Sequence, residues 1–335
     1  MLKGKIVNLK ILISLIFIAI LASAPYLIGV YRLSVLRDIL IWIALSVCWH
    51  FFSGQTKYIA LGSVAFFGTG LYITAIYLNF SVKKGIWPIL PFPAIVLLAG
   101  LINFALALAI GSISLRLKGI YFAIATFGFG ELVKGIIKYW QTVIMKTYII
   151  FLPYFDSQTV YYSVLTTMLA TLLLITFLRK SKFGIALRMI GECEDAAAHV
   201  GVNTNLYKVL GFAISAMCIG LIGGSYAIRF PSTNVDAMFL TDYSFLPAVM
   251  VLLGGIGSAY GPILGSATLA LISEYLRANA EYTAYFKLIV GLTLIVIILF
   301  MPYGIMGAIE KVKSTKFFGK INGKIKSIKG PKTPF

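Results

Sequence analysis

Long runs of apolar residues, almost free of charge, constrain the fold of this chain more than any other feature. Residues 11–24, 94–113 and 287–300 are such runs, and similar ones recur along the sequence. About 18 or more such residues are enough to cross the hydrocarbon core of a bilayer as a helix. Hydrophobic residues make up 60% of the 335 and charged residues only 12%, so little polar surface remains for soluble domains. The sequence therefore predicts an all-α membrane protein.

About ten transmembrane helices account for the apolar runs. The eighth is short, which is typical of a broken or re-entrant segment. One transmembrane domain is expected over residues 1–310, followed by a basic tail over 311–335. The predicted spans cover residues 11–30, 36–52, 58–79, 92–114, 119–139, 159–179, 206–228, 243–255, 260–278 and 284–301.

The net charge of +18 is concentrated in segments that flank the apolar runs. Lysine and arginine gather near the N-terminus, around residues 179–188 and in the tail. The positive-inside rule places such segments in the cytoplasm. With an even number of spans, both termini and residues 116–118 also lie inside. This placement favours an orientation signal and contact with anionic membrane lipid over nucleic-acid binding.

The N-terminal segment and the cysteines give weaker signals. Residues 1–24 are basic and then apolar, like a signal peptide, and Ala22-Ser23-Ala24 offers a weak cleavage site. The length of the apolar run favours an uncleaved first span. Cys48, Cys193 and Cys218 are scattered, and no Cys/His cluster occurs in the sequence, so neither a disulfide framework nor a metal site is indicated.

The order of the spans predicts an inverted repeat. Spans two to five and seven to ten are two groups of four, offset by an odd number of spans, so the groups have opposite orientations. Gly62 and Gly68 in the first half have a faint counterpart in the glycines of 254–265. The outer loops, 81–91, 146–158 and 230–242, are short. Substrate must therefore arrive through an open pore, from bulk solution or from a separate capture protein.

A glycine-rich stretch lies at the boundary of the eighth and ninth spans. Gly257, Gly261 and Gly265 recur every four residues, and small residues at this spacing allow membrane helices to pack closely. Pro262 suits the first turn of a helix, because an N–H there has no intrahelical partner and proline lacks the N–H. A second interpretation is that a break at 254–257 exposes backbone that lines a substrate path.

Glu131 is an ionisable residue in the middle of the fifth predicted span. A carboxylate at that depth costs roughly 2–3 kcal/mol on insertion scales and usually faces a cavity or a partner. It either binds the ammonium group of a zwitterionic substrate or is a protonated or paired structural residue, with Lys134 one turn away. Glu274 and Arg277, three residues apart, are interpreted as a structural pair at a helix end.

The longest polar segment, residues 179–208, has a helical pattern of its own. A short helix is expected over 192–200, because Gly201 fits a helix-stopping position. Asn203 and its neighbours offer caps for the following span. Two short helices joined by glycine favour a docking element over a solvated loop.

The same segment resembles the EAA loop of ABC importer permeases over residues 192–201, ECEDAAAHVG. Its continuation and four further blocks are similar, in order, to the branched-chain amino acid permeases of the LivM type. Three features depart from the family: Asp195 stands where the residue is usually apolar, Cys193 replaces a common acidic residue, and Gln55-Thr56-Lys57 replaces Gln-x-Ser near the substrate path. The blocks are GQTKYIALGSVAFFGTGLY (54–72), LRLKGIYFAIATFGFGEL (115–132), VLLGGIGSAYGPILGSA (251–267) and MPYGIMG (301–307).

The resemblance implies a permease subunit of the cytoplasmic membrane that translocates branched-chain or other hydrophobic amino acids. It has no ATPase of its own, in agreement with the lack of a GxxxxGK[ST] loop in the sequence. The implied partners are a LivH-like second permease, two cytoplasmic ABC ATPases carrying ATP and Mg²⁺, and an extracytoplasmic substrate-binding protein; this chain itself needs no cofactor. A cytoplasmic coupling loop is implied over 180–205, with these residues: Glu192, Glu194, Ala196, Ala197 and Gly201.

Several functions remain open from the sequence alone. Family relatives also carry urea or short amides, or sugars and nucleosides. An ion-coupled transporter would favour several buried acidic residues, and Glu131 is the one candidate away from span ends. His50 and His199 belong to no catalytic motif, which argues against an enzyme. The candidates for the translocation path are Gly62, Gly68, Glu131, Gly254, Gly255 and Gly257.

Overall fold

The structure is a computed structural model that describes residues 18–84, 90–278 and 304–307, together with positions 16, 288, 291 and 292. The chain divides into two compact units, Met1–Ala248 and Val249–Phe335, which are described separately. Within the described residues, the fold is helical apart from one short two-stranded ribbon. This confirms the predicted all-α fold class.

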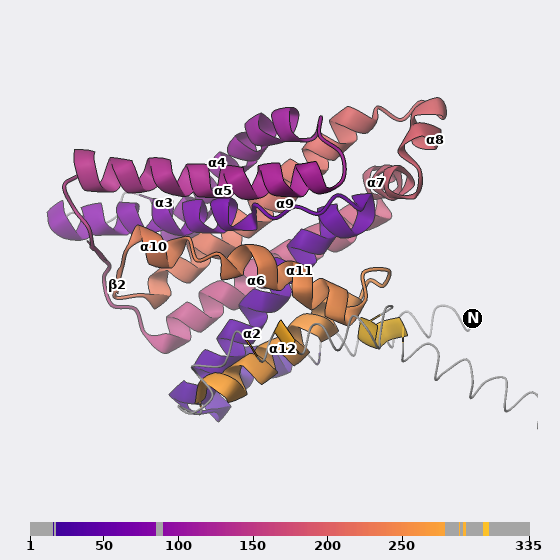
Figure 1. The fold of residues 1–335 in the computed structure, drawn as a ribbon. Coiled ribbons are helices and arrows are strands. Elements are labelled where there is room, and N and C mark those ends of the chain that lie inside the picture. The colour runs from indigo at the N-terminus through magenta and orange to yellow at the C-terminus, as the bar shows by residue number, and fades with distance from the viewer. Residues whose placement is uncertain are drawn as a thin grey trace, which may run out of the picture. The chain divides into compact units, whose positions relative to one another are not determined.

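The first unit contains most of the long helices (Figure 1). A π-helical turn, His50–Gly54, extends α2, and a second, Trp140–Ile144, extends α5. The strands β1 (Ile150–Phe151) and β2 (Ser232–Thr233) pair antiparallel, with Ile150 opposite Thr233. The helices are α2 (Val30–Trp49), α3 (Ser63–Lys84), α4 (Phe92–Ser114), α5 (Ile120–Tyr139), α6 (Ser157–Lys180), α7 (Lys182–Glu192), α8 (Glu194–His199), α9 (Thr204–Tyr226) and α10 (Val235–Met238).

Helix α11 (Asp242–Gly254) crosses the division between the units, and α12 (Gly261–Ala278) belongs to the second. Pro262 lies in the first turn of α12, as predicted. Gly257 lies before the helix begins, so the expected helical face shared with Gly261 and Gly265 contains only the last two. Added Cβ atoms at Gly261 and Gly265 would overlap backbone atoms at Gly255 and Met250. Close packing therefore accounts for both helical glycines.

Seven described helical segments are long and apolar enough to cross a membrane, and the shorter helix Ile18–Leu27 precedes them. They correspond to predicted spans two to eight, and the fourth, 92–114, has the predicted bounds. The ninth predicted span corresponds to α12. Glu274 and Arg277 lower the mean hydropathy of this helix. Residues 11–15 and 17 of the first predicted span and most of the tenth lie outside the described residues. The count of ten and the inverted repeat stay predictions.

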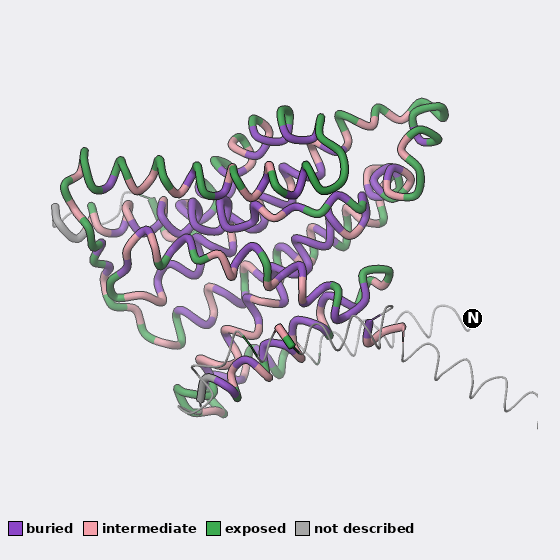
Figure 2. Tube along the Cα trace, in the orientation of Figure 1, coloured by how far each residue is buried: buried purple, intermediate pink, exposed green. Residues whose placement is uncertain are grey.

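Helix α9 is at the centre of the first unit and packs mainly against α3 and α4. Small residues allow this close approach, since an added Cβ at Gly223 would overlap the carbonyl of Phe67 and one at Gly70 would overlap that of Gly220. Membrane helices lack a hydrophobic driving force between them and depend on such contacts. The glycines are therefore part of the core, which Figure 2 shows as buried along these helices.

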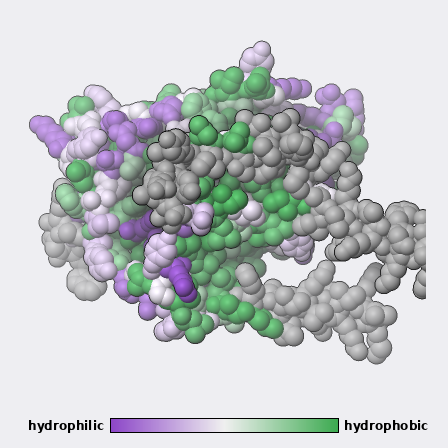
Figure 3. Space-filling model, turned by 60° about the horizontal axis from the view of Figure 1, so that its bottom comes forward, coloured by the Kyte–Doolittle hydropathy of each residue, from purple (hydrophilic) through white to green (hydrophobic). Residues whose placement is uncertain are grey.

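In contrast to α9, helix α5 exposes a stripe of large apolar residues that includes Ile124, Leu132 and Ile136. It is the least buried of the seven candidate spans, and exposed turns are visible along it in Figure 2. Hydrophobic residues also occupy much of the coloured surface seen in Figure 3. An apolar exterior of this kind is expected of helices that contact lipid or another membrane subunit.

The loop between α6 and α9 contains the two short helices α7 and α8. The helix predicted over 192–200 begins instead at Glu194, because Cys193 is extended and separates the two helices. No glycine joins them, contrary to the prediction. Gly201, with φ of +90°, follows α8, and the Asn203 side chain accepts from the Leu206 N–H as the N-cap of α9. Both of these predicted signals are confirmed.

Candidate functional site

The folded loop, residues 181–203, lies at one end of the first unit, and β2 and α10 lie at the other (Figure 1). These are called the α7/α8 end and the β1/β2 end. At the α7/α8 end the loop meets residues 55–62, the connector between the extended α2 and α3. The contact between loop and connector is the candidate functional site.

The connector is an ordered segment with its own hydrogen bonds. The Trp49 indole donates to the carbonyl of Ala60 over 2.7 Å, and the Ala60 N–H donates to the Ser53 hydroxyl over 3.2 Å. Lys57 has φ of +60°, a conformation that few non-glycine residues adopt and that breaks the helical path. Residues 58–62, predicted as the start of a span, therefore form an ordered non-helical segment before α3 begins at Ser63.

The connector is also tied to α5 at its far end. The Leu61 N–H donates to the hydroxyl of Thr126 over 3.1 Å, and an added Cβ at Gly62 would lie 2.5 Å from the carbonyl of Thr126. Gly62 is buried, and this close contact with α5 requires the absence of a side chain. Hydrogen bonds at Ala60 and Leu61 thus hold the connector close to the start of α3, and the Thr56 hydroxyl, which donates to the carbonyl of Phe52 over 2.8 Å, holds its beginning.

Helix α7 packs directly on the connector backbone. Its buried residues, Gly184, Ala186, Leu187 and Ile190, recur at helical spacing along one side. At its last turn, an added Cβ at Gly191 would overlap the carbonyl of Gln55. No residue with a side chain fits at Gly191 unless the helix and the connector separate.

Three side chains join the loop, the connector and α9 in a buried cluster. The Tyr58 hydroxyl donates to Glu194 Oε2 over 2.7 Å, and Lys208 Nζ donates to Glu194 Oε1 over 2.5 Å. Lys208 Nζ also lies 3.3 Å from Tyr58 Oη and 4.8 Å from the centre of the tyrosine ring. The side chains of Lys208 and Glu194 are 5% and 21% exposed. Charge-assisted hydrogen bonds in such surroundings fix geometry strongly.

The cluster sets the protonation of its members. Burial alone would raise the pKa of the Glu194 carboxyl, but hydrogen bonds from Lys208 and Tyr58, with the more distant charge of Lys118, lower it below the usual value. Burial and the hydrogen bond to Glu194 raise the pKa of the Tyr58 phenol. At neutral pH Glu194 is therefore a carboxylate and Tyr58 remains a donor.

Two weaker contacts flank the cluster. Lys57 Nζ lies 3.8 Å from Glu192 Oε2, and both side chains are largely exposed, at 61% and 75%. In the orientation that satisfies its neighbours, the Gln55 amide donates to the carbonyl of Gly184 over 3.1 Å and accepts from Arg179 Nε over 3.3 Å. The Gln55–Lys57 departure from the family pattern therefore lies against the loop between α6 and α9.

The predicted coupling residues divide into an inward and an outward group. Glu194 is partly buried in the cluster and Ala197 is buried, whereas Glu192, Ala196 and Gly201 are exposed. Val200, which the sequence reasoning did not single out, is an apolar residue exposed beside them. The outward group belongs to a surface with both apolar and polar character.

The predicted path residues of the first unit differ in burial. Gly62 and Gly68 are buried, and an added Cβ at Gly68 would lie 2.6 Å from the Phe239 ring. Glu131 is exposed on α5. In the second unit, Gly254 and Gly255 are buried and Gly257 is exposed. That these residues line the translocation path stays a prediction.

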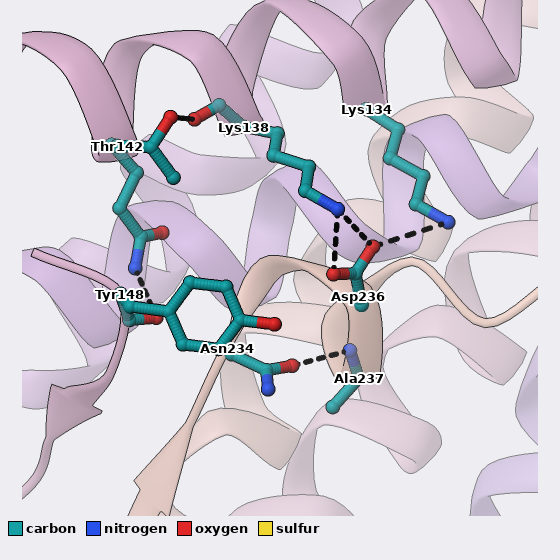
Figure 4. Close-up of polar contacts among 8 residues, drawn as sticks. Lys134, Lys138, Thr142, Tyr148, Asn234, Asp236 and Ala237 are labelled. Carbon is teal, nitrogen blue, oxygen red and sulfur yellow. Dashed lines mark hydrogen bonds and ion pairs between the residues drawn. The ribbon is translucent and has the colours of Figure 1, made fainter.

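A second group of charges lies at the β1/β2 end (Figure 4). Lys138 Nζ lies 2.8 Å from Asp236 Oδ2 and Lys134 Nζ lies 3.7 Å from Asp236 Oδ1. Lys134 thus pairs with α10, although it was considered as a partner for Glu131. Figure 4 shows both lysines reaching from α5 toward the start of α10, where the Asn234 side chain accepts from the Ala237 N–H.

The sequence reasoning missed Tyr58, Lys208 and Asp236. Tyr58 falls inside a quoted family block and Lys208 inside the continuation of the loop, but no periodic pattern joins them to Glu194, and 136 residues separate Tyr58 from Glu194. Charged residues close to span ends are the one available signal, and Lys208 and Asp236 both fit it. Among the described residues, no group of three or more His, Cys, Asp or Glu residues is placed to hold a metal ion.

The described helices and the packed loop define a multi-pass membrane protein. The family model described as branched-chain amino acid transport system / permease component matches residues 31–298, and the chain belongs to this family.

Individual relatives agree with the family. The high-affinity branched-chain amino acid transport system permease protein LivM of Salmonella typhimurium is 26% identical, over 90% of this chain and 76% of its own length. The LivM protein of Escherichia coli is 26% identical over 87% of this chain and 74% of its own length. The permease protein LivH of Escherichia coli is 34% identical over 44% of this chain and 48% of its own length.

Proposed function

We propose that the chain is a permease subunit of an ATP-binding-cassette importer that carries branched-chain or other hydrophobic amino acids across the cytoplasmic membrane. The family supports a transport role, and the relatives named above are permeases for branched-chain amino acids. The observation that carries the proposal is the folded loop with α7 and α8, which is clamped to the connector and leaves an outward surface free for a partner.

In this proposal the α7/α8 end is cytoplasmic and contacts one of two partner ATPases. The ATPases bind ATP and Mg²⁺, and this chain binds no cofactor. Exposed Val200, with Ala196 beside it, offers apolar contact area, and Glu192 and Asp195 offer charges at the rim. An interface with an apolar centre and a polar rim is typical of protein–protein contacts. The β1/β2 end is then extracytoplasmic and receives substrate from a binding protein.

The second permease subunit completes the translocation path along α5. This helix is the least buried candidate span, and its exposed stripe carries Glu131 between Gly128 and Gly135, two glycines around which no atom lies within 4 Å of an added Cβ. A carboxylate in a span avoids lipid and faces protein or water. A LivH-like subunit seated against this stripe would enclose Glu131, which then meets the ammonium group of a passing amino acid.

The test is uptake in proteoliposomes that contain this chain, the second permease, the ATPases and the binding protein. Uptake of radiolabelled leucine is expected to require ATP and all components, and valine and isoleucine are expected to compete. As a control, an ATPase lacking the lysine of its phosphate loop should abolish uptake. Uptake that follows an ion gradient without ATP, or competition by urea or ribose alone, would overturn the assignment.

A further inference from the structure

The loop between α6 and α9 reaches the rest of the first unit by two routes. One is the covalent chain, which enters through Ser181 and leaves through Asn203. The other is non-covalent and includes the contact with the connector at Tyr58 and Gly191. On this route Phe183 of α7 also packs against Phe51 of the π-helical turn and Tyr207 of α9. The routes differ in how well each can carry a displacement into the membrane.

The covalent route contains several non-helical positions. Ser181 is extended, with φ of −77° and ψ of 169°, and Cys193 is extended between α7 and α8. Gly201 has φ of +90°, and Asn203 has ψ of 87°. Loop residues of this kind absorb changes in φ and ψ and act as hinges. A displacement of α8 would therefore be transmitted only in part to α6 and α9 through the covalent chain.

The connector is also non-helical from Lys57 to Gly62, with φ of +60° at Lys57, but hydrogen bonds restrain its backbone. Ala60 bonds with Trp49 and Ser53, and the adjacent Leu61 bonds with Thr126. It continues directly into α3 and follows directly from the π-helical turn after α2. A segment with this many buried hydrogen bonds moves as a body, because opening it would leave buried polar groups unpaired.

We infer that Tyr58, Glu194 and Lys208 form a latch that makes α8 and the connector move together, so that displacement of the loop reaches α2 and α3 through the connector. The inference rests on the proposed function. Lys208 belongs to α9 and extends the latch to the central helix of the unit. Tyr58 and Lys208 are thus positioning residues that act through Glu194.

The first experiment removes one atom of the latch. Tyr58→Phe keeps the ring against Lys208 and removes the hydroxyl that bonds Glu194. In the complete reconstituted complex, leucine uptake and ATP hydrolysis are measured in the same vesicles. The number of leucine molecules moved per ATP is expected to fall by roughly ten- to a hundredfold, the range for loss of one hydrogen bond to a charged group. The amount of ATPase that co-purifies is expected to stay constant.

The matched control is Lys57→Gln, one residue away on the same connector. Lys57 faces the same loop through Glu192, but its side chain is 61% exposed, and such pairs contribute little. Transport per ATP is expected to be unchanged. Equal losses in the two variants, or no loss in Tyr58→Phe, would overturn the latch. If the wild-type complex shows no ATP-driven uptake, the proposed function fails, which is a separate result.

The second experiment replaces the latch by a covalent link. Lys57→Cys and Glu192→Cys, with exposed Cys193→Ser to prevent side reactions, are joined by a short bifunctional thiol reagent. With Tyr58 intact, the link is expected to leave transport per ATP at the value measured before linking. In the Tyr58→Phe background, the link is expected to restore that value. A link that abolishes uptake in both backgrounds would show that the junction must open during transport, which contradicts the latch.

Discussion

The two ends of the first unit are built differently, although each joins distant segments through an ion pair. At the α7/α8 end, the side chains of Lys208 and Glu194 are 5% and 21% exposed and share a tyrosine hydroxyl. At the β1/β2 end, the side chains of Lys138 and Asp236 are 45% and 40% exposed. The first junction is enclosed by protein, and the second faces outward.

This difference determines how each junction responds to force. Exposed ion pairs are screened and contribute little, so they exchange partners at small cost. A buried pair is not a strong source of net stability, but breaking it is expensive, because a charge is left without a partner. The α7/α8 end is therefore suited to keep its geometry under load, whereas the β1/β2 end is suited to rearrange. In the proposed importer, the first receives force from the ATPase and the second opens to substrate.

The largest expected effect is the loss of the buried cation. Lys208→Met leaves the Glu194 carboxylate without its main partner, and breaking a buried pair costs roughly 3–5 kcal/mol. Because Glu194 keeps some contact with solvent, the lower end of that range is expected. The measurement is the midpoint of thermal unfolding of the purified permease in detergent, at one scan rate for all variants.

The control for Lys208→Met is Lys57→Met at the same junction. It removes an exposed charge, and the expected change is below about 1 kcal/mol. A small shift in both variants would show that burial does not distinguish the two pairs, and the contrast between the two ends of the unit would lose its basis.

A second prediction concerns backbone contact at the same junction. In Gly191→Ala the new methyl group overlaps the carbonyl of Gln55, so α7 must shift away from the connector. Overpacking of this kind costs roughly 1–3 kcal/mol. Uptake is expected to fall by about tenfold, since a cost near 1.4 kcal/mol is one factor of ten. Gly135→Ala on α5 is the control for this chain alone, because no atom lies within 4 Å of its added Cβ; a similar loss there would instead indicate contact with the second subunit.

The fold was predictable where length and polarity decide it. The span 92–114 was found with its observed bounds, because an apolar run follows Pro91 without interruption. Span two was placed at residue 36, but α2 begins at Val30. The charged residues Arg37 and Asp38 lie inside this helix, where Arg37 is buried beside Asp38, which also pairs with Arg229. Arg229 is far from Asp38 in the sequence, so this ion pair could not be predicted from the residues around Asp38.

The candidate site was predictable only in part, for a similar reason. The acidic start, the alanines and Gly201 marked the loop, since they are consecutive in the sequence. Its contact with the connector depends on pairs separated by 136 and 150 residues. Neither helical periodicity nor a spacing rule extends over such distances, so the surface receiving the loop needed three-dimensional coordinates.

A third prediction uses pH to separate the ends. Lys208, Tyr58 and Lys118 face Glu194 and lower its pKa, against the effect of burial. The folded state therefore favours the carboxylate, and its contribution is fully present above the ordinary glutamate pKa of about 4.3. It is lost as the pH falls through the lowered value. The protection factors of residues 181–203, that is, exchange rates corrected for the intrinsic pH dependence of amide exchange, are expected to be constant down to about pH 5 and to fall only below it.

The control for this titration is Glu194→Gln, which should lack the acid-dependent step while retaining any general acid unfolding. The difference between the two proteins isolates the carboxylate. An identical acid profile in both would mean that Glu194 does not control the protection of the loop.

The smallest effect is expected from Asp236→Asn at the β1/β2 end. Asp236 contacts Lys134 and Lys138, but it is 40% exposed, so the change in unfolding free energy should be below about 1 kcal/mol and should shrink further in high salt. Unfolding midpoints at low and high salt test the stability, and leucine uptake per ATP tests the function. If uptake falls while stability does not, the tie between α5 and α10 takes part in opening the extracytoplasmic end. The comparison would then be between a junction that stays closed and a junction that opens, because a contact that breaks during the cycle can affect transport without affecting stability.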